Sequence, residues 1–438
     1  MKRRNFINIS ILAALSNTII SQAVMGQAVE ENRTEWEKTL TDSSVSPWEE
    51  GMLDIHQINT GRGNSTFIIF PDGTTMLIDA GDLGSTRGLS QKIMPACPDA
   101  TCLPGEWIAR YIKKFLPVRN SSNDLDYVLL THFHTDHIGY STTDSKHSKN
   151  GNYALAGVTE VAEHLKIGKI IDRGWPSYDY PSKGLVKKAA GSHFNFDNYL
   201  SFLEWQIQNR DLRVEHFDVG SQNQIKPLYK TFSNYKVQNI YCNGALWMGD
   251  GHLTKALFPE ISTLEPKDYP NENQCSCVIK ISYGNFDYYS GGDITGVISP
   301  NTPRWKDVET PVGEVVGPVD AALLNHHGYS DSQNDNFIKY IQPKIWIIPV
   351  WDFYHPQPEV LERICNKNNY PLERKIYATG LVKENEERLG ALADQIEKPT
   401  GHILLRVYDG GDKFRVFSVS DESKDYFIKS ISSYFYSK

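Results

Sequence analysis

The most informative stretch of the chain is Thr131-His132-Phe133-His134-Thr135-Asp136-His137, which follows the apolar run Val128-Leu129-Leu130. Residues two apart point the same way in an extended loop, so His132 and His134 can bind one metal ion. Asp136 and His137 come after the chain turns, and they can bind a second ion. Imidazoles and carboxylates suit zinc and tolerate iron or manganese. The stretch therefore predicts a centre for two divalent metal ions.

Three other predicted strands also end in Asp or His residues. The apolar runs that end at residues 78, 289 and 324 lead into Asp79, Asp293 and the pair His326-His327. In a layered α/β protein, the carboxyl ends of the strands form the edge at which functional sites are built. These side chains are therefore expected beside the His-rich stretch.

Turn residues between apolar runs predict three β-hairpins. Their strands are expected over 67–70 and 76–79, over 278–283 and 286–290, and over 402–407 and 414–419. A helix is expected over 107–115, and a buried strand over 126–131. No linker rich in proline or serine and no internal repeat divides the chain, which favours one large domain over residues 51–438.

The motifs at these strand ends resemble, as a set, those of the metallo-β-lactamase fold superfamily. The set comprises Leu-Ile-Asp79-Ala-Gly, His132-x-His134-x-Asp136-His137, Gly-Gly-Asp293 and His326-His327-Gly. More narrowly, Asn273-x-x-Ser276-x-Val278, Gly-Gly-Asp293 and the Val319-Asp320 before His-His-Gly resemble the metallohydrolase domain of ComEC-type DNA-uptake proteins and their free-standing secreted relatives. The resemblance implies an α/β (α+β) fold, a four-layer αββα sandwich, with a long insertion at about residues 140–275.

Carried over residue by residue, the resemblance implies a ligand set for two divalent ions, zinc in preference to manganese or iron. The implied ligands are His132 and His134 for the first ion, Asp136 and His137 for the second ion, and Asp293 as a bridge. One residue of the pair His326 and His327 would complete the second site. The sequence does not choose between these two histidines.

Two further aspartates are expected near the ions. Asp79 would accept a hydrogen bond from a ligand imidazole and so fix its tautomer. The superfamily usually has one more His ligand for the first ion, before the bridging Asp, and no familiar motif marks it here. Asp172, at the end of a predicted strand, is the candidate for this ligand. The same interval also contains His164, His193, His216 and His252.

The implied activity is hydrolysis. A water held between the two ions would lose its proton near neutral pH and attack the substrate, with Asp136 orienting it. The resemblance to a DNA-uptake domain favours a phosphodiester, in a nucleotide or a nucleic acid. A lactone, ester or β-lactam hydrolase uses the same ligands. A non-catalytic metal-binding module of the same fold is the alternative from another class.

The charge of the chain argues against tight binding of polyanions. Its formal net charge is −8, so no global basic surface is expected to hold a nucleic acid in a stable complex. A small molecule or a phosphodiester substrate is the expected partner. Neither the composition nor the motifs define an oligomeric state.

Residues 1–28 are typical of a secretory signal peptide. Lys2-Arg3-Arg4 precedes an apolar run from Ile9 to Ile20, and Gly26-Gln27-Ala28 provides a cleavage pattern. The run is too short to span a bilayer, so no membrane anchor is expected. The adjacent arginines also resemble a twin-arginine signal. The chain is therefore expected to be exported, as a periplasmic or secreted protein, with residues 29–50 as a polar peripheral segment.

The chain has six cysteines, and an oxidising compartment would permit some of them to pair. Cys97 and Cys102 flank a short turn and form the expected disulfide. Cys275 and Cys277 alternate along a predicted strand, where a direct bridge between them is geometrically awkward. No pair has the C-x2-C spacing of a zinc site, so the cysteines are expected to be structural or free otherwise.

Overall fold

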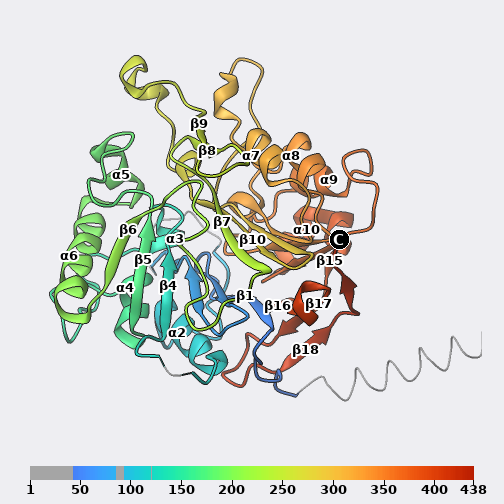
Figure 1. The fold of residues 1–438 in the computed structure, drawn as a ribbon, viewed down its shortest axis with the longest axis horizontal. Coiled ribbons are helices and arrows are strands. Elements are labelled where there is room, and N and C mark those ends of the chain that lie inside the picture. The colour runs from blue at the N-terminus through green and yellow to red at the C-terminus, as the bar shows by residue number, and fades with distance from the viewer. Residues whose placement is uncertain (1–42, 85–92, 120) are drawn as a thin grey trace, which may run out of the picture.

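The computed structural model describes residues 43–84, 93–119 and 121–438 (Figure 1). The expected signal peptide and residues 29–42 of the polar segment lie outside the described residues. Two large β-sheets form the centre of the molecule, and helices lie on their outer faces.

The first sheet has ten strands in the described part of the chain. In spatial order they are β18 (Ile428–Ile431), β17 (Lys413–Val419), β16 (His402–Tyr408), β1 (Leu53–Gln57), β2 (Thr66–Ile69), β3 (Thr75–Ile78), β4 (Leu125–Leu129), β5 (Ile167–Asp172) and β6 (Arg213–His216), with β19 (Phe435–Tyr436) paired to β17. Strands β3 to β6 run parallel to one another. Their carboxyl ends therefore share one edge of the sheet.

The second sheet has nine strands among the described residues. In spatial order they are β15 (Ile396–Glu397), β14 (Lys375–Ala378), β13 (Ile345–Ile348), β12 (Ala321–Leu323), β11 (Phe286–Ser290), β10 (Val278–Tyr283), β7 (Tyr235–Cys242), β8 (Ala245–Trp247) and β9 (Thr254–Ala256). Strands β11 to β15 are parallel. This sheet too presents a row of carboxyl ends at one edge.

The helices form the two outer layers. Against the first sheet lie α2 (Pro104–Phe115), α4 (Val158–His164), α5 (Lys183–Ala189) and α6 (His193–Arg210). Against the second lie α7 (Glu309–Val316), α8 (Asp335–Ile341), α9 (Pro358–Cys365) and α10 (Lys383–Leu389). Figure 1 shows α4 and α6 on one side of the molecule and α7 to α9 on the other.

Three buried apolar clusters hold these layers together, and strand alternation explains them. In β3, Leu77 packs with the helices of the first sheet, whereas Met76 and Ile78 pack between the two sheets. In β12, Ala322 faces the second set of helices and Leu323 faces the other sheet. Successive strand residues point to opposite faces, so both sheets are apolar on both sides. The expected four-layer αββα sandwich is confirmed.

The predicted hairpins are confirmed as well. β10 and β11 have the expected bounds and pair antiparallel around Gly284, whose φ is +55°. β2 pairs antiparallel with β3, and β16 with β17. Helix α2 begins three residues earlier than predicted, because Pro104 occupies the first helical position, where its missing N–H is not needed.

Residues 140–275, which the sequence set apart as a long insertion, contribute to both sheets. β5 and β6 extend the first sheet, β7 to β9 extend the second, and α4 to α6 cover the first. The interval therefore contains strands and helices that are continuous with the layers of the sandwich.

The expected disulfide between Cys97 and Cys102 is wrong, because both thiols are free in the described structure. Asn59 Nδ2 donates to Cys97 Sγ over 3.5 Å, while the Cys102 thiol lies against Glu106 of α2. Among the described residues, no helix is both long enough and apolar enough to cross a bilayer.

Candidate metal centre

The predicted ligands lie at the carboxyl ends of strands from both sheets. The stretch 132–137 follows β4, and its last residues begin α3 (Thr135–Ile138), a single helical turn. Asp293 follows β11, and His327 follows β12. Because the two sheets pack face to face, these strand ends meet.

Two overlapping groups of ligand atoms form at this point. One group comprises Asp136, His137, Asp293 and His327, and the other comprises His132, His134 and Asp293. Within each group the ligand atoms lie within 4.8 Å of one another. Asp293 belongs to both groups, as a bridging carboxylate must.

The hydrogen bonds made by the Nδ1 atoms of His137 and His327 determine which nitrogen of each neutral imidazole carries a free lone pair. His137 Nδ1 lies 2.7 Å from the Asp79 carboxylate, and His327 Nδ1 lies 3.0 Å from the carbonyl oxygen of Pro349. Each Nδ1 therefore carries a proton and donates it. Both Nε2 atoms then present lone pairs, yet they lie 3.2 Å apart, and a carboxylate oxygen lies within 3.2 Å of each. Four electron-rich atoms in such contact need a positive charge among them, which either protons or a divalent metal ion can supply.

The cluster also shifts proton affinities. Burial opposes charge on His327, but the carboxylates of Asp293 and Asp136 raise its pKa to about 9. Burial opposes charge on Asp293 too, yet His137, His327 and His132 hold the pKa of that carboxyl well below its usual range. The second group thus attracts a proton strongly, and metal must compete with that proton.

The first group is smaller. His132 Nε2 lies 3.1 Å from His134 Nδ1 and 3.7 Å from Asp293 Oδ2. His132 is fully buried and His134 is half-buried, so the group is accessible at His134. Burial, together with the neighbouring His137, lowers the pKa of His132 well below its usual value, which keeps this imidazole neutral and able to bind metal.

Asp79 contacts the centre through His137, as the sequence predicts. Its Oδ2 accepts hydrogen bonds from His137 Nδ1 at 2.7 Å, Asn64 Nδ2 at 3.0 Å and Thr131 Oγ1 at 2.9 Å, and its Oδ1 accepts from Thr131 N at 2.8 Å. Asp79 is fully buried and has a φ of +59°, a left-handed conformation that is uncommon for a residue other than glycine. The surrounding contacts over-determine this conformation, which is typical of functional sites.

Only one histidine of the pair 326–327 enters the ligand groups. Both residues have left-handed backbone conformations, with φ of +47° and +53°, and their ring centroids lie 6.4 Å apart. His327 Nε2 lies 3.1 Å from Asp136 Oδ2. His326 Nδ1 instead lies 2.7 Å from Asp331 Oδ1, and its Nε2 is 3.2 Å from Asn273 Nδ2. His326 therefore flanks the centre, 4.0 Å from Asp293 Oδ2.

Two residues just before β10, Glu272 and Ser276, support the centre, and no sequence motif assigns a role to Glu272. Glu272 Oε1 accepts hydrogen bonds from Phe133 N at 2.8 Å and from Arg173 Nε at 2.7 Å, within a buried ion pair. Ser276 Oγ accepts from Asp293 N at 3.2 Å. The only sequence signal for Glu272 was its position beside the Asn-x-x-Ser motif.

The predicted role of Asp172 as a ligand is wrong. Its Oδ1 accepts hydrogen bonds from Gly174 N and Trp175 N, and its Oδ2 accepts from the hydroxyls of Tyr178 and Tyr199, all at 2.8 Å. Both oxygens of this carboxylate accept hydrogen bonds that stabilise the segment after β5, and Asp172 belongs to neither ligand group. Four histidines of the same interval also lie outside both groups: His164, His193, His216 and His252.

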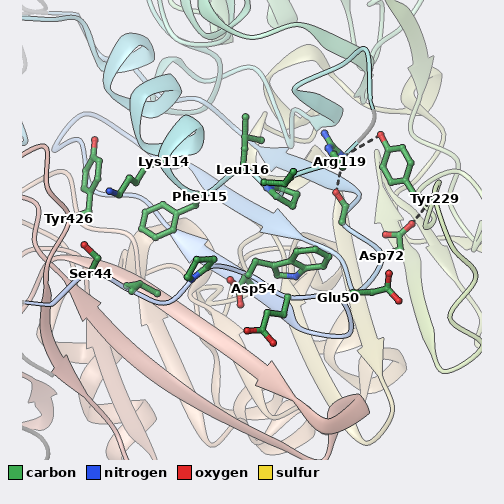
Figure 2. Close-up of a pocket in the computed structure, with 17 residues that line it drawn as sticks. Ser44, Glu50, Asp54, Asp72, Lys114, Phe115, Leu116, Arg119, Tyr229 and Tyr426 are labelled. Atoms are coloured by element: carbon green, nitrogen blue, oxygen red, sulfur yellow. Dashed lines mark hydrogen bonds between the residues drawn. The ribbon is translucent and has the colours of Figure 1, made fainter.

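A cavity of about 790 Å³ lies away from these ligands, between α2 and the segment before β1. Figure 2 shows Lys114 and Tyr426 at one end of it and Arg119 and Tyr229 at the other. None of its lining residues is a predicted metal ligand. This cavity is therefore separate from the metal centre.

The segment that carries the His-rich stretch has a known family resemblance. Residues 58–143 match the Metallo-beta-lactamase superfamily. The matched segment contains Asp79, His132, His134, Asp136 and His137, whereas Asp293 and His327 lie beyond it. This is a superfamily of metal-dependent hydrolases, and its fold binds divalent metals, often two. The two packed sheets with outer helices are consistent with the metallo-β-lactamase αββα sandwich.

Two solved structures are similar to the chain at low sequence identity. The diiron beta-hydroxylase CmlA from Streptomyces venezuelae aligns with a TM-score of 0.37 and 14% identity, over 83% of this chain and 55% of that one. A protein from Parabacteroides distasonis, assigned as a metal-dependent hydrolase, aligns with a TM-score of 0.32 and 11% identity, over 74% of this chain and 92% of that one. The chain thus spans little more than half the length of the first. No curated protein matches the chain.

Proposed function

We propose that this chain is a hydrolase that depends on two divalent metal ions, zinc in preference to manganese or iron. The proposed ligands are His132 and His134 for the first ion, Asp136, His137 and His327 for the second, and Asp293 for both. The observation that carries the proposal is the contact between His137 Nε2 and His327 Nε2, which face each other at 3.2 Å beside two carboxylates. A mixed set of imidazoles and carboxylates fits zinc.

Divalent ions bound here would supply Lewis acidity, which activates water near neutral pH and polarises the substrate oxygen. The side chains of the protein would present the ligand atoms and position the backbone that carries them. Asp79 and the Pro349 carbonyl accept hydrogen bonds from Nδ1 of His137 and of His327, which keeps the proton of each imidazole on Nδ1. Both Nε2 atoms therefore remain available as ligands. Glu272 anchors the backbone between His132 and His134 through Phe133 N.

Asp136 is the side chain proposed to orient the attacking water. It is 8% exposed, whereas Asp293 is 2% exposed, so it is the carboxylate of the second group that solvent reaches more readily. The histidines beside Asp136 hold its pKa below the usual range despite burial, which keeps it ionised as an acceptor. An ionised carboxylate at this position can accept a hydrogen bond from the nucleophile.

The proposed substrate is a phosphodiester, as in the ComEC-type domains. Two ions suit in-line displacement at phosphorus. The motif that carries the narrower resemblance contacts the site, since Ser276 binds Asp293 N and Asn273 contacts His326. The net charge of −8 favours a small or briefly bound substrate over a stable complex with nucleic acid. We also propose that residues 1–28 direct the protein out of the cytoplasm, to the periplasm or the medium.

Hydrolysis of bis(p-nitrophenyl) phosphate by the metal-loaded chain tests this function. Asp136→Asn should lower the rate by about 10²–10⁴-fold, the contribution of a positioned acid–base group. The exposed Asp250→Asn serves as the matched control and should leave the rate unchanged.

A parallel panel of lactone, ester and β-lactam substrates separates the alternatives. Cleavage of one of these without cleavage of phosphodiesters would overturn the substrate assignment and leave the hydrolase intact. Bound metal with no turnover of any substrate in the panel would instead favour a non-catalytic module.

A further inference from the structure

A separate group of metal-ligating side chains lies between helices α2 and α4. Glu106 is in the first turn of α2, and Glu160 and His164 lie one helical turn apart in α4, where side chains share a face. Their ligand atoms lie within 4.8 Å of one another. None of the three belongs to the centre at the strand ends.

Glu160 is the member that points to a ligand. The residue is only 1% exposed, and its Oε2 has no hydrogen-bond partner in the part of the chain that the structure describes. Burial, and next the negative charge of Asp82, raise the pKa of Glu160 to about 8, although the backbone N–H of Glu106 opposes this rise by contacting the carboxyl group. A buried carboxylate oxygen without a donor is strongly unfavourable unless a proton or a cation neutralises it.

The neighbouring groups leave room for a cation. Arg110 donates both of its hydrogen bonds to Oε1 of Glu106, at 3.0 and 2.6 Å, which leaves Oε2 free of the guanidinium. His164 is half-buried, and burial lowers the pKa of its imidazole, which favours the neutral form. A neutral imidazole, the Glu106 carboxylate and the Glu160 carboxyl, whose proton a cation can displace, are thus available together.

A path from solvent also exists. Glu106 and Glu160 both line a cavity of about 500 Å³, whose other charged lining residues are Asp82, Asp144 and Lys146. Even with Glu160 protonated, three acidic side chains face one basic side chain in this cavity, which gives it a negative potential that attracts cations.

We propose that Glu106, Glu160 and His164 bind a further divalent cation of the zinc class and thereby fasten α2 to α4. The imidazole nitrogen favours zinc over magnesium or calcium, which prefer oxygen ligands throughout. The Cys102 thiol, which lies against Glu106, adds a soft donor next to the group.

Such an ion would stabilise a helix that packs against the catalytic segment. α4 begins after Gly157, where an added Cβ would lie 2.3 Å from the Ala80 carbonyl oxygen and 2.4 Å from that of Ile138. The start of α4 is therefore in tight contact with the residue after Asp79 and with the end of α3. Holding α4 in place supports the backbone that presents the ligands of the main centre.

Zinc content and thermal unfolding of the full chain test the proposal, with zinc alone as the probe. After equilibration with buffered zinc, the wild type should hold one equivalent more than Glu160→Gln or His164→Gln. His216→Gln, an exposed histidine on the edge strand β6, is the matched control and should retain the wild-type content. In a chelator, Glu160→Gln should unfold at a higher temperature than the wild type, because it removes the unpaired carboxylate. Added zinc should raise the unfolding temperature of the wild type by more than that of either variant.

Equal zinc content in the wild type and both variants, or an equal zinc-dependent shift, would overturn the proposal and show that Glu160 is simply protonated. His164 lies at the end of α4 and is partly exposed, so His164→Gln is expected to fold. If Glu160→Gln does not fold, the zinc content and the zinc-dependent unfolding temperature of His164→Gln test the proposal. Loss of metal from the main centre leaves the difference between wild type and His164→Gln intact, so the two proposals fail separately.

Discussion

Replacing Asp79 with asparagine tests how the protein keeps His137 ready to bind metal. Oδ2 of Asp79 accepts three hydrogen bonds, from His137 Nδ1, Asn64 Nδ2 and the Thr131 hydroxyl. Because Oδ1 of Asp79 also accepts, from Thr131 N, the NH2 of an asparagine faces a donor in either orientation, and at the Oδ2 position it faces the His137 N–H and the Asn64 NH2. The imidazole can relieve the clash by moving its proton to Nε2. That proton would then occupy Nε2, the nitrogen proposed to bind the ion.

The expected loss in metal affinity is about 10–100-fold, as is typical when the partner of a ligand histidine is removed. This corresponds to about 1.4–2.7 kcal/mol of binding free energy. Competition with a chromophoric chelator near neutral pH measures the dissociation constant directly. The variant should keep its fold, because asparagine has nearly the volume of aspartate.

Asp172→Asn is the matched control, since Asp172 is also a fully buried aspartate that ends a strand of the same sheet. It should lose stability, by about 1–3 kcal/mol for its disrupted hydrogen bonds, and keep its affinity for metal. This account of the centre would be refuted if Asp79→Asn kept the metal affinity of the wild type, or if both variants lost metal affinity to the same extent.

Three further predictions, which use four substitutions, give measurable outcomes. His327→Gln should lower bound metal by about one equivalent, whereas His326→Gln, whose Nδ1 contacts Asp331, should leave metal content unchanged in elemental analysis; the opposite pattern would reverse the ligand assignment. Arg406→Met should lower the free energy of unfolding in urea by about 3–5 kcal/mol, because it leaves Asp54 buried without its two hydrogen bonds from the guanidinium. A loss below about 1 kcal/mol would show that Asp54 finds another partner or takes up a proton. Burial lowers the pKa of His402 to about 3, against about 6.5 when unfolded, so between these values the unfolded chain binds a proton that the folded chain does not. Stability should therefore fall on acidification below about pH 6.5, by up to about 1.4 kcal/mol per pH unit from this residue. His402→Gln should flatten the dependence, and an unchanged slope would contradict the assignment.

The sequence predicts most of the sandwich because its strands carry local signals. Apolar alternation on either side of Gly284-Asn285 defines β10 and β11 to the residue. The positions of Asp79, which contacts His137, and of the proposed ligand Asp293 also have local signals, because each stands directly after or close to an apolar strand whose carboxyl end lies at the functional edge. These features depend on residues that are close together in the sequence, so the local pattern is sufficient to predict them.

The remaining features depend on contacts between distant segments. Asp172 has the same strand-end position as Asp79, and only the hydroxyls of Tyr178 and Tyr199 reveal that its oxygens are already used. The choice between His326 and His327 follows from two left-handed backbone conformations that the sequence His-His-Gly does not specify. The Cys97–Cys102 disulfide was inferred from spacing alone, and spacing does not define the direction of the thiols.

Metal titration of the stripped chain tests the two-metal hydrolase most directly. The His164→Gln variant is the best starting material, because it removes the proposed site between α2 and α4 from the count. Hydrolysis of bis(p-nitrophenyl) phosphate should rise from near zero as zinc or manganese is added and should level off at about two ions per chain. Asp293→Asn should bind less metal and remain inactive. Undiminished hydrolysis by the stripped protein, or a stripped protein that takes up no metal, would contradict the proposal.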